Sequence, residues 1–385
     1  MATTSSSALP PTTRAVVCRE YGKPLSFDTL QTPTAEPGSA VVKILAAIVD
    51  PSEKERLLLK ERNVHFSQQP PFIPGNCAVG RIAALGKDAT SLKLGQLVLL
   101  DPFTRGRDDP NAQIIRAVFE GPSPSAKALS HQEGLWRDGF WTEYARSPLE
   151  NCFPLDEKVL LGSVEQGGLG YGIGSIPYLM KHAVAYGGLR AIDLKAGETI
   201  IISPATGNHS GAAVQVATAM GARVIAVGRN AETLKLLAES NPRVHPVHLT
   251  GNVGQDVGLL TQFGTVDAFM DFTPSSMQNP LHMKACVLAV KQYGKGVLMG
   301  FPHGDFSLPY GLVIGKNITI RGQYMYEGED VRGLIKLTER GLLKLGESSG
   351  ARVLDYTLDQ YNEAISKAAE SQAWGLQVAI RPFTE

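Results

Sequence analysis

The stretch TIIISPATGNHSG, residues Thr199–Gly211, decides the fold of this chain. It opens with an apolar, β-branched run of the kind that buried parallel strands require. A glycine-containing turn follows, and residues 212–220 have helical character. A second strand is expected at 223–227 and a second helix at 231–239. A turn in this position lets the backbone approach a pyrophosphate at the helix N-terminus, so the stretch predicts a dinucleotide site.

The turn departs from the usual three-glycine pattern of such sites. Its three positions hold Ala205, Gly207 and Ser210, so only the middle glycine is present. Small side chains at the other two positions still permit close packing. The alternative is a plain turn between strand and helix that binds no cofactor. We expect the cofactor contacts here to come from Ala205, Thr206, Gly207, Asn208, His209 and Ser210.

The end of the second strand indicates which cofactor binds. An NAD site places Asp or Glu there to bind the ribose 2′-hydroxyl. This chain has Gly228, Arg229 and Asn230 instead, with no carboxylate to repel a 2′-phosphate. The planar guanidinium of Arg229 can grip such a phosphate. The sequence therefore predicts NADP(H) as the cofactor; the alternative is that Arg229 is a solvated surface charge.

The rest of the C-terminal half repeats the alternation of strand and helix. Further strands are expected at 268–271, 296–299 and 318–320, which predicts an α/β fold with a parallel, doubly wound sheet. One more helix (331–345) and a strand (377–380) follow. Ligands bind at the carboxyl ends of such strands. We therefore expect contacts on the nicotinamide side from Thr273, Gly300 and Phe301.

The N-terminal half reads as β structure. Short strand-like runs between residues 14 and 100, separated by Pro and Gly, suggest a barrel or sandwich. Residues 101–136 read as a loop, and residues 1–13, rich in Ser, Thr and Pro, are expected to form a disordered tail.

Composition narrows the function classes. The 385 residues favour two domains, and a hydrophobic fraction of 43% suffices for a core in each. Lys plus Arg and Asp plus Glu both number 37, so no net field attracts nucleic acid or an anionic membrane. The four cysteines have no paired spacing, which suits a reducing compartment. We expect a cytoplasmic protein that acts on a small-molecule substrate.

Four motifs carry a resemblance to a known family. They are VKILAA (Val42–Ala47), FIPG (Phe72–Gly75), GARVIA (Gly221–Ala226) and KNITIRG (Lys316–Gly322). With them the chain resembles the medium-chain dehydrogenase/reductase superfamily, most closely its zinc-independent fungal members that are alcohol dehydrogenase-like or quinone oxidoreductase-like.

The resemblance implies a domain plan. It implies a GroES-like β-barrel catalytic domain over residues 14–181 and 323–385 and a Rossmann NADP-binding domain over 182–322. It also implies a cleft between them and, usually, a homodimer. We expect that dimer to use residues 317–322, an apolar, β-branched strand that would otherwise be an exposed edge.

The chain departs from the zinc-dependent members of the family at the ligand positions. Those positions hold Asp50, Asn76 and, near the third, Gly172, and no cysteine lies within residues 101–141. A catalytic zinc needs three protein ligands and an open position. The resemblance therefore implies a protein without a metal.

The same comparison implies the catalytic residues. Asp50, Ser52 and Asn76 replace the metal shell, and Asn76 can donate to a substrate carbonyl. Tyr171, Ser175 and Tyr324 are expected near the nicotinamide or the entrance. The alternatives are that Asp50 hydrogen-bonds its own turn and that the others are packing or hinge residues.

The predicted reaction follows from the missing metal. Without a Lewis acid, reduction of an activated C=C bond in an enone, enoyl group or quinone is favoured, because donors can stabilise the charge on a distant oxygen. The alternatives are a zinc-free carbonyl reductase or alcohol dehydrogenase, and a non-redox enzyme or binding protein on the same fold.

Overall fold

The computed structural model of the chain describes residues 9–59, 67–131, 136–277, 280–302, 305 and 307–383. Two compact units divide it. The first contains the chain up to Tyr178, Arg352–Gln372 and the residues from Leu376 onward. The second contains Leu179–Ala351 and Ala373–Gly375. The predicted fold class, a GroES-like domain with a Rossmann domain, is confirmed.

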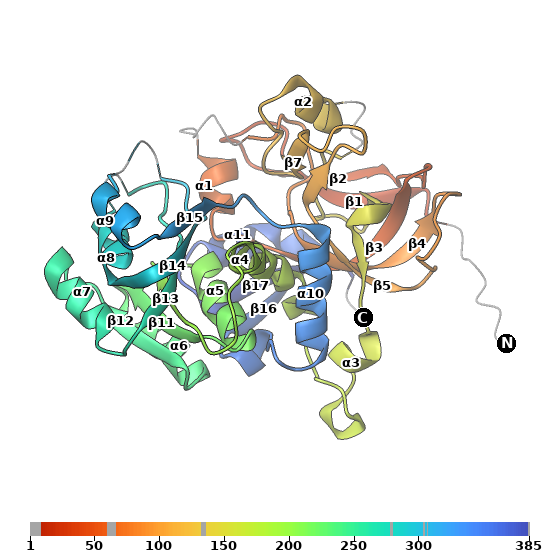
Figure 1. Cartoon of the computed structure of the whole chain (residues 1–385). Helices are drawn as coiled ribbons and strands as arrows, with labels where there is room; N and C mark the ends of the chain where they lie inside the picture. Colours follow the sequence, from red (N-terminus) through yellow and green to blue (C-terminus); the bar gives the residue numbers. More distant parts are fainter. Residues whose placement is uncertain are drawn as a thin grey trace. The chain divides into compact units, whose positions relative to one another are not determined.

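The first unit is built on a seven-stranded sheet with the order β16-β17-β3-β4-β5-β9 and with β8 paired to β3 (Figure 1). Only β16 and β17 pair in parallel; the other pairs are antiparallel. The strands are β3 (Ser39–Ile48), β4 (Ala78–Leu85), β5 (Leu97–Leu100), β8 (Tyr144–Pro148), β9 (Cys152–Pro154), β16 (Arg352–Thr357) and β17 (Leu376–Arg381).

Short elements complete this unit. A separate hairpin pairs β1 (Thr12–Val17) with β2 (Ser26–Gln31). Its helices are α1 (Glu53–Leu58), α2 (Pro124–His131), α3 (Glu157–Leu161) and α11 (Tyr361–Ala368). The apolar faces of the sheet, the hairpin and α11 share one hydrophobic core.

The second unit is a six-stranded sheet with the order β12-β11-β10-β13-β14-β15, in which every neighbouring pair is parallel. This is the order of a doubly wound dinucleotide-binding sheet. The strands are β10 (Thr199–Ser203), β11 (Arg223–Gly228), β12 (Val244–His248), β13 (Val266–Asp271), β14 (Val290–Leu298) and β15 (Thr319–Gly322).

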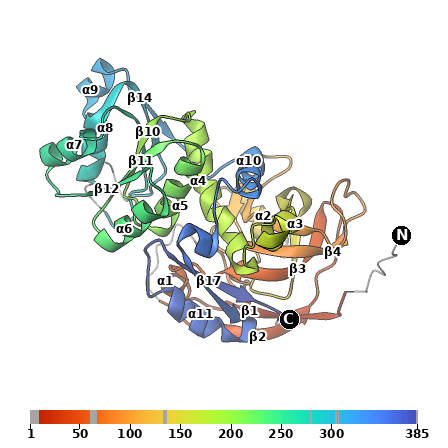
Figure 2. The same cartoon turned by 90° about the horizontal axis from the view of Figure 1, so that it is seen from below.

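Helices cover both faces of that sheet. Figure 2 shows α4, α5 and α6 on one face and α7, α8 and α9 on the other. The helices are α4 (Leu179–Ala191), α5 (Asn208–Ala219), α6 (Ala231–Ser240), α7 (Val253–Thr261), α8 (Leu281–Ala289), α9 (Tyr310–Gly315) and α10 (Gly328–Glu339). Because both faces are covered, β10 is buried along its whole length.

Three expectations need correction. The tail ends before Thr12, because β1 pairs with β2 from that residue and the Thr13 hydroxyl lies 3.2 Å from that of Thr142; residues 1–8 lie outside the described part of the chain. The stretch 101–136 is not only loop, since it holds α2 and the paired strands β6 (Phe103–Arg105) and β7 (Gln113–Ile115).

The third correction concerns the second unit, which extends beyond the expected range 182–322. It includes α10, because α10 packs on α4 and Asp330 forms an ion pair with Arg190 at 3.2 Å. Among the described residues, no helix is long and apolar enough to cross a membrane.

Candidate functional site

The turn after β10 is tied down at both ends. The backbone N–H of Ala205 donates to the carbonyl of Val227 on β11 at 2.6 Å, and Ala205 is fully buried. The N–H of Gly207 donates to the Ser210 hydroxyl at 3.0 Å, which caps the start of α5. The turn is therefore held in one shape without the outer two glycines of the usual pattern.

Helix α5 begins earlier than expected, at Asn208, so Asn208, His209 and Ser210 form its first turn. Backbone N–H groups in the first turn of a helix lack intrahelical partners and favour a bound anion. The buried Nδ2 atom of Asn208 has no hydrogen-bond partner within the described ranges. A buried amide without a partner is costly, so this group is available to donate to a bound ligand.

A distant segment lies against this turn. Gly207 forms an antiparallel bridge with Ala373, and the N–H of Trp374 donates to the carbonyl of Thr206 at 3.0 Å. A Cβ atom added at Gly211 would lie 2.3 Å from Cγ of the Trp374 ring. Only glycine fits there. Sequence reasoning missed this neighbour because about 160 residues separate the two segments, and no local pattern links them.

The end of β11 lies beside the same turn. A Cβ atom added at Gly228 would lie 2.6 Å from Cγ2 of Thr206, so a side chain at this position requires the Thr206 side chain to move. Arg229 is exposed, and its guanidinium forms no ion pair or hydrogen bond with the residues that the structure describes. Asn230 has a structural role, because its side chain caps α6 by accepting from the N–H of Thr233 at 3.0 Å.

The predicted nicotinamide-side residues lie after β13 and β14. The N–H of Phe301 donates to the carbonyl of Thr273 at 3.0 Å. This hydrogen bond joins the segment after β14, which contains Gly300, to the segment after β13. The buried Thr273 hydroxyl is engaged with the Asp271 carboxylate and lies 3.1 Å from Nε2 of His282. The N–H of Thr273 also donates to the Asp271 carboxylate, at 3.0 Å, so both the hydroxyl and the N–H of Thr273 are engaged within the protein. The network with Asp271 and His282 was not predicted.

Five of the six predicted catalytic residues belong to the first unit, and three of these, Asp50, Ser52 and Ser175, have clear structural partners. One carboxylate oxygen of Asp50 accepts from the N–H of Ser52 at 2.9 Å and from its hydroxyl at 2.6 Å. Asp50 thus closes its own turn before α1, as the alternative interpretation held. The buried hydroxyl of Ser175 donates to the carbonyl of Gly172 at 2.7 Å.

The side chain of Asn76, unlike those of Asp50, Ser52 and Ser175, has a buried polar atom that can accept a hydrogen bond from a ligand. Its buried Oδ1 atom has no hydrogen-bond partner among the described residues. A side-chain amide carries both a donor and an acceptor, so this group can bind a polar atom of a ligand. Tyr171, in the same unit, is 8% exposed.

Tyr324 belongs to the second unit. Its side chain is 41% exposed, and partial burial raises the pKa of its hydroxyl to about 12. The phenol therefore keeps its proton throughout the neutral range.

The former ligand positions do not suit zinc. The Asp50 carboxylate is already engaged by Ser52, Asn76 offers an amide, and Gly172 has no side chain. Neutral amides are not among the usual zinc ligands. Within the described ranges, no group of three or more His, Cys, Asp or Glu side chains could hold a metal ion.

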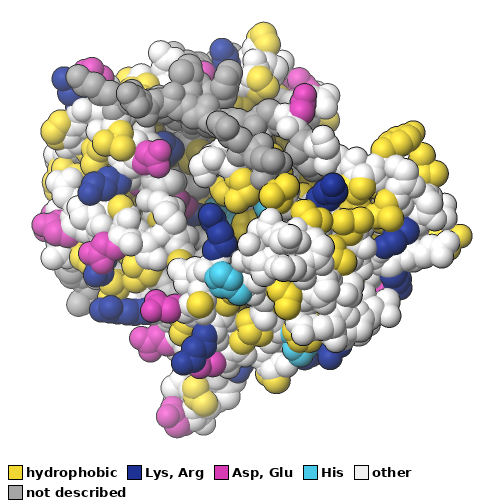
Figure 3. Space-filling view, turned by 90° about the vertical axis from the view of Figure 1, so that its left-hand side faces the viewer, with side chains coloured by type: hydrophobic (Ala, Val, Ile, Leu, Met, Phe, Trp, Pro, Cys, Tyr) yellow, Lys and Arg dark blue, Asp and Glu magenta, His cyan; other side chains and the backbone are white. Residues whose placement is uncertain are grey.

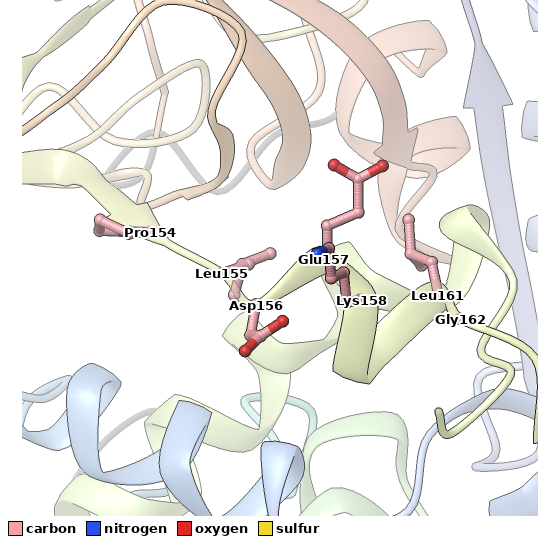
Figure 4. Close-up of a pocket in the computed structure, with 7 residues that line it drawn as sticks. All are labelled: Pro154, Leu155, Asp156, Glu157, Lys158, Leu161 and Gly162. Atoms are coloured by element: carbon pink, nitrogen blue, oxygen red, sulfur yellow. The ribbon is translucent and has the colours of Figure 1, made fainter. Parts of the chain in front are cut away.

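A surface hollow of about 850 Å³ lies where β9 leads into α3 (Figure 4). Its two carboxylates already have partners: Glu157 forms a two-fold contact with Arg81, and Asp156 caps α3. No predicted cofactor or catalytic residue lines it. The candidate site is therefore built from the glycine turn and its neighbouring strand ends, not from this hollow.

Comparison with known proteins agrees with this geometry. Residues 36–157 match the family described as an alcohol dehydrogenase GroES-like domain, and residues 210–340 match the one described as a zinc-binding dehydrogenase. The chain belongs to the medium-chain dehydrogenase/reductase superfamily. It is an oxidoreductase that uses a nicotinamide dinucleotide cofactor and a small-molecule substrate.

Individual relatives have several activities. The chain is 25% identical to an alcohol dehydrogenase of Rhizobium meliloti (strain 1021), over 86% of this chain and 89% of that protein. It is 25% identical to an NAD-dependent alcohol dehydrogenase of Sulfurisphaera tokodaii, over 95% and 99%. It is 24% identical to an acryloyl-coenzyme A reductase of Metallosphaera sedula, over 86% and 90%.

Solved structures share the fold. The 2R,3R-butanediol dehydrogenase of Bacillus subtilis has a TM-score of 0.73 at 17% identity, covering 96% of this chain and all 100% of that one. A protein from Sinorhizobium meliloti 1021 that is described as a zinc-binding dehydrogenase, solved bound to NADP, has a TM-score of 0.72 at 18% identity, covering 96% and 99%.

Proposed function

We propose that this protein is a zinc-independent, NADPH-dependent oxidoreductase that reduces an activated C=C bond, as in an enone, an enoyl group or a quinone. The observation that carries the proposal is the set of residues at the zinc-ligand positions of the family. Asp50 is engaged with Ser52, Asn76 is an amide and Gly172 has no side chain. The Asn76 amide can offer the substrate a hydrogen bond, and the three positions do not supply the three ligands that a catalytic zinc needs.

Hydrogen bonds suit this reaction better than reduction of a simple ketone. When hydride adds to an enone, negative charge develops on the carbonyl oxygen, away from the attacked carbon, and a well-placed donor stabilises it. We assign this role to the side-chain N–H group of Asn76, because only the nitrogen of an amide can donate to the developing charge. A simple ketone needs stronger polarisation, which a metal usually supplies.

The roles of the other residues follow from their chemistry. When bound, NADPH supplies the hydride. The turn from Ala205 to Ser210 and the first turn of α5 bind its pyrophosphate, and Arg229 binds its 2′-phosphate. Reduction also needs one proton; Tyr324, whose phenol stays protonated at neutral pH, and Tyr171 are the proposed donors.

NADPH is preferred over NADH in this proposal because no carboxylate stands at residues 228–230. One structural neighbour was solved with NADP, whereas the relative from S. tokodaii is NAD-dependent. The relative from M. sedula is an acryloyl-coenzyme A reductase, which accords with C=C reduction.

A zinc-free carbonyl reductase or alcohol dehydrogenase is the second candidate. The relative from R. meliloti, an alcohol dehydrogenase, favours it. We also propose that the protein acts in the cytoplasm, which accords with four free, buried cysteines.

The test is NADPH oxidation by purified protein against a matched panel: an enone, its saturated ketone, a quinone and an aldehyde. We expect turnover of the enone or quinone and little of the saturated ketone. The saturated product, identified by mass, confirms that the C=C bond was reduced. Exclusive turnover of the ketone and aldehyde establishes the second candidate. Cofactor binding without turnover of any class moves the protein to a non-redox role.

The role of Asn76 is tested in the same assay. We expect Asn76→Leu to lower kcat for the enone about a hundredfold to a thousandfold, in line with the loss of one donor to a developing oxyanion. Asn76→Gln, which keeps the amide, should retain more activity. Unchanged kcat in Asn76→Leu contradicts this assignment.

A further inference from the structure

The ends of three neighbouring strands surround Arg229. Strands β10, β11 and β12 are adjacent in the sheet, and Gly228 on β11 pairs directly with His248 on β12. On the β10 side of β11, the Thr206 side chain lies so close to Gly228 that a side chain at residue 228 would displace it. Any phosphate bound by Arg229 therefore lies near residues of all three strand ends.

Two hydrogen bonds from the end of β12 hold the backbone at Arg229. The N–H of Leu249 donates to the carbonyl of Gly228 at 3.0 Å. The ring of His248 lies with its Nε2 atom 3.0 Å from the carbonyl oxygen of Arg229. A carbonyl oxygen can only accept, so Nε2 carries the proton and His248 is the donor.

Arg229 is therefore a cationic side chain whose backbone is held in place by hydrogen bonds. The Arg229 side chain is exposed and forms no ion pair with the described residues, while its own carbonyl is anchored by His248. A guanidinium binds phosphate through two N–H groups in one plane. The strength of this contact therefore depends on the direction in which the backbone points the side chain. Fixing the backbone before binding lowers the ordering cost of the complex.

We propose that His248 is a positioning residue that determines cofactor specificity: it anchors the Arg229 backbone so that the guanidinium meets the 2′-phosphate of NADP(H). This inference rests on the proposed NADPH preference. It adds a residue at the end of β12, outside the segment 228–230 that the sequence singled out. It also separates two functions, because Arg229 supplies the charge and His248 supplies its placement.

The experiment compares the binding of NADPH, NADH, 2′,5′-ADP and ADP by calorimetry. The variants are His248→Ala, which removes the donor, and His248→Gln, whose amide can still donate to the carbonyl. His245→Ala is the matched control: it lies on the same strand, but its ring stacks on Phe263 and accepts from Arg223.

We expect His248→Ala to weaken NADPH and 2′,5′-ADP by about threefold to tenfold, the effect of one net hydrogen bond. NADH and ADP should change by less than about twofold, since neither carries the 2′-phosphate. His248→Gln should recover most of the loss, and His245→Ala should keep the wild-type ratio of NADPH to NADH affinity.

Three results overturn the inference, and they differ in what else they affect. If wild type prefers NADPH and His248→Ala keeps the same ratio, the inference alone fails. If His248→Ala weakens all four ligands equally, the residue supports the fold and not specificity. If wild type binds NADPH and NADH equally, the proposed cofactor preference fails and the inference falls with it.

Discussion

Arg229 is the residue at which the cofactor proposal can be tested most directly. Its exposed guanidinium has no ion pair within the described ranges. A charge-assisted hydrogen bond contributes about 1.5–3 kcal/mol, or about tenfold to a hundredfold in affinity. We therefore expect Arg229→Ala to weaken NADPH at least about tenfold while leaving NADH nearly unchanged, as measured by titration calorimetry.

Arg229→Lys is the matched variant, because it keeps the charge and loses the planar fork. We expect an intermediate affinity for NADPH. Equal affinities of the wild type for NADPH and NADH contradict the proposed cofactor preference itself. A substitution toward NADH specificity is better made at Arg229, by replacing it with an acidic residue. A side chain at Gly228 would displace Thr206, so Gly228→Asp would disturb the glycine turn as well as the specificity.

Residue types predicted the position of the turn between β10 and α5, while its role in cofactor binding stays a prediction. Ala205, Gly207 and Ser210 occupy the turn as expected, because a chain that folds back between a buried strand and a helix leaves few alternatives. Asp50, Ser175 and Asn230 are engaged in local hydrogen bonds of their own segments. Short polar side chains choose such partners according to the local backbone conformation, which residue identity does not determine.

At the scale of elements, Arg116 ties the segment after β7 to β8. The side chain is 1% exposed. Its guanidinium donates to the carbonyls of Asp138 and Arg146, at 2.6 and 2.8 Å, and to the Ser147 hydroxyl at 3.2 Å. Burial lowers the pKa of Arg116 to about 10, which still leaves it charged at neutral pH.

We expect Arg116→Leu to lower the free energy of unfolding by about 2–4 kcal/mol, because it leaves the carbonyls of Asp138 and Arg146 and the Ser147 hydroxyl without this donor. Urea denaturation followed by circular dichroism measures the loss. Arg19→Ala is the control, since the exposed pair that Arg19 forms with Asp28 contributes about 1 kcal/mol or less. Equal stability of Arg116→Leu and wild type would show that the segment is held by other contacts.

The elements that sequence patterns predicted are the buried ones. Strands β10, β11 and β13 each contain a buried apolar run, at residues 200–202, 224–227 and 268–270. Strand β12 was missed because its sequence, VHPVH, alternates His and Pro with Val. A proline is tolerated there because β12 is an edge strand, where a missing backbone N–H costs no hydrogen bond to a neighbour. Strands β6 and β7 have three residues each, too few for a periodic pattern.

At the scale of the whole molecule, the proposal predicts a protein without bound zinc. Elemental analysis of purified protein should find far less than one zinc per chain, because Asp50, Asn76 and Gly172 replace the ligands. Incubation with a chelator should leave enone reduction unchanged. About one zinc per chain, removed by the chelator together with activity, contradicts this prediction.

The proposed homodimer is a second prediction at this scale. Strand β15 is the edge of its sheet, and an unpaired edge strand attracts another chain. Exposed apolar side chains on neighbouring elements include Tyr293, Tyr310 and Ile314, and Figure 3 shows hydrophobic side chains gathered on one part of the surface.

We expect sedimentation at micromolar concentration to give the mass of two chains. The outward-facing amides of β15 should exchange with deuterium more slowly as the protein concentration rises. A monomer mass, or exchange at β15 that does not depend on concentration, would rule out this interface.

The contact between Trp374 and Gly211 has a consequence for synthesis. Trp374 is added to the growing chain about 170 residues after the Thr206 carbonyl that it covers. At about 5–20 residues per second, this delay is on the order of ten to thirty seconds. During that time the first turn of α5 lacks its contact with Trp374, although all strands of the second unit have already been synthesised. The cofactor turn of this enzyme is therefore completed late in translation, and a chain released before Trp374 has all the strands of the second unit but an unfinished cofactor turn.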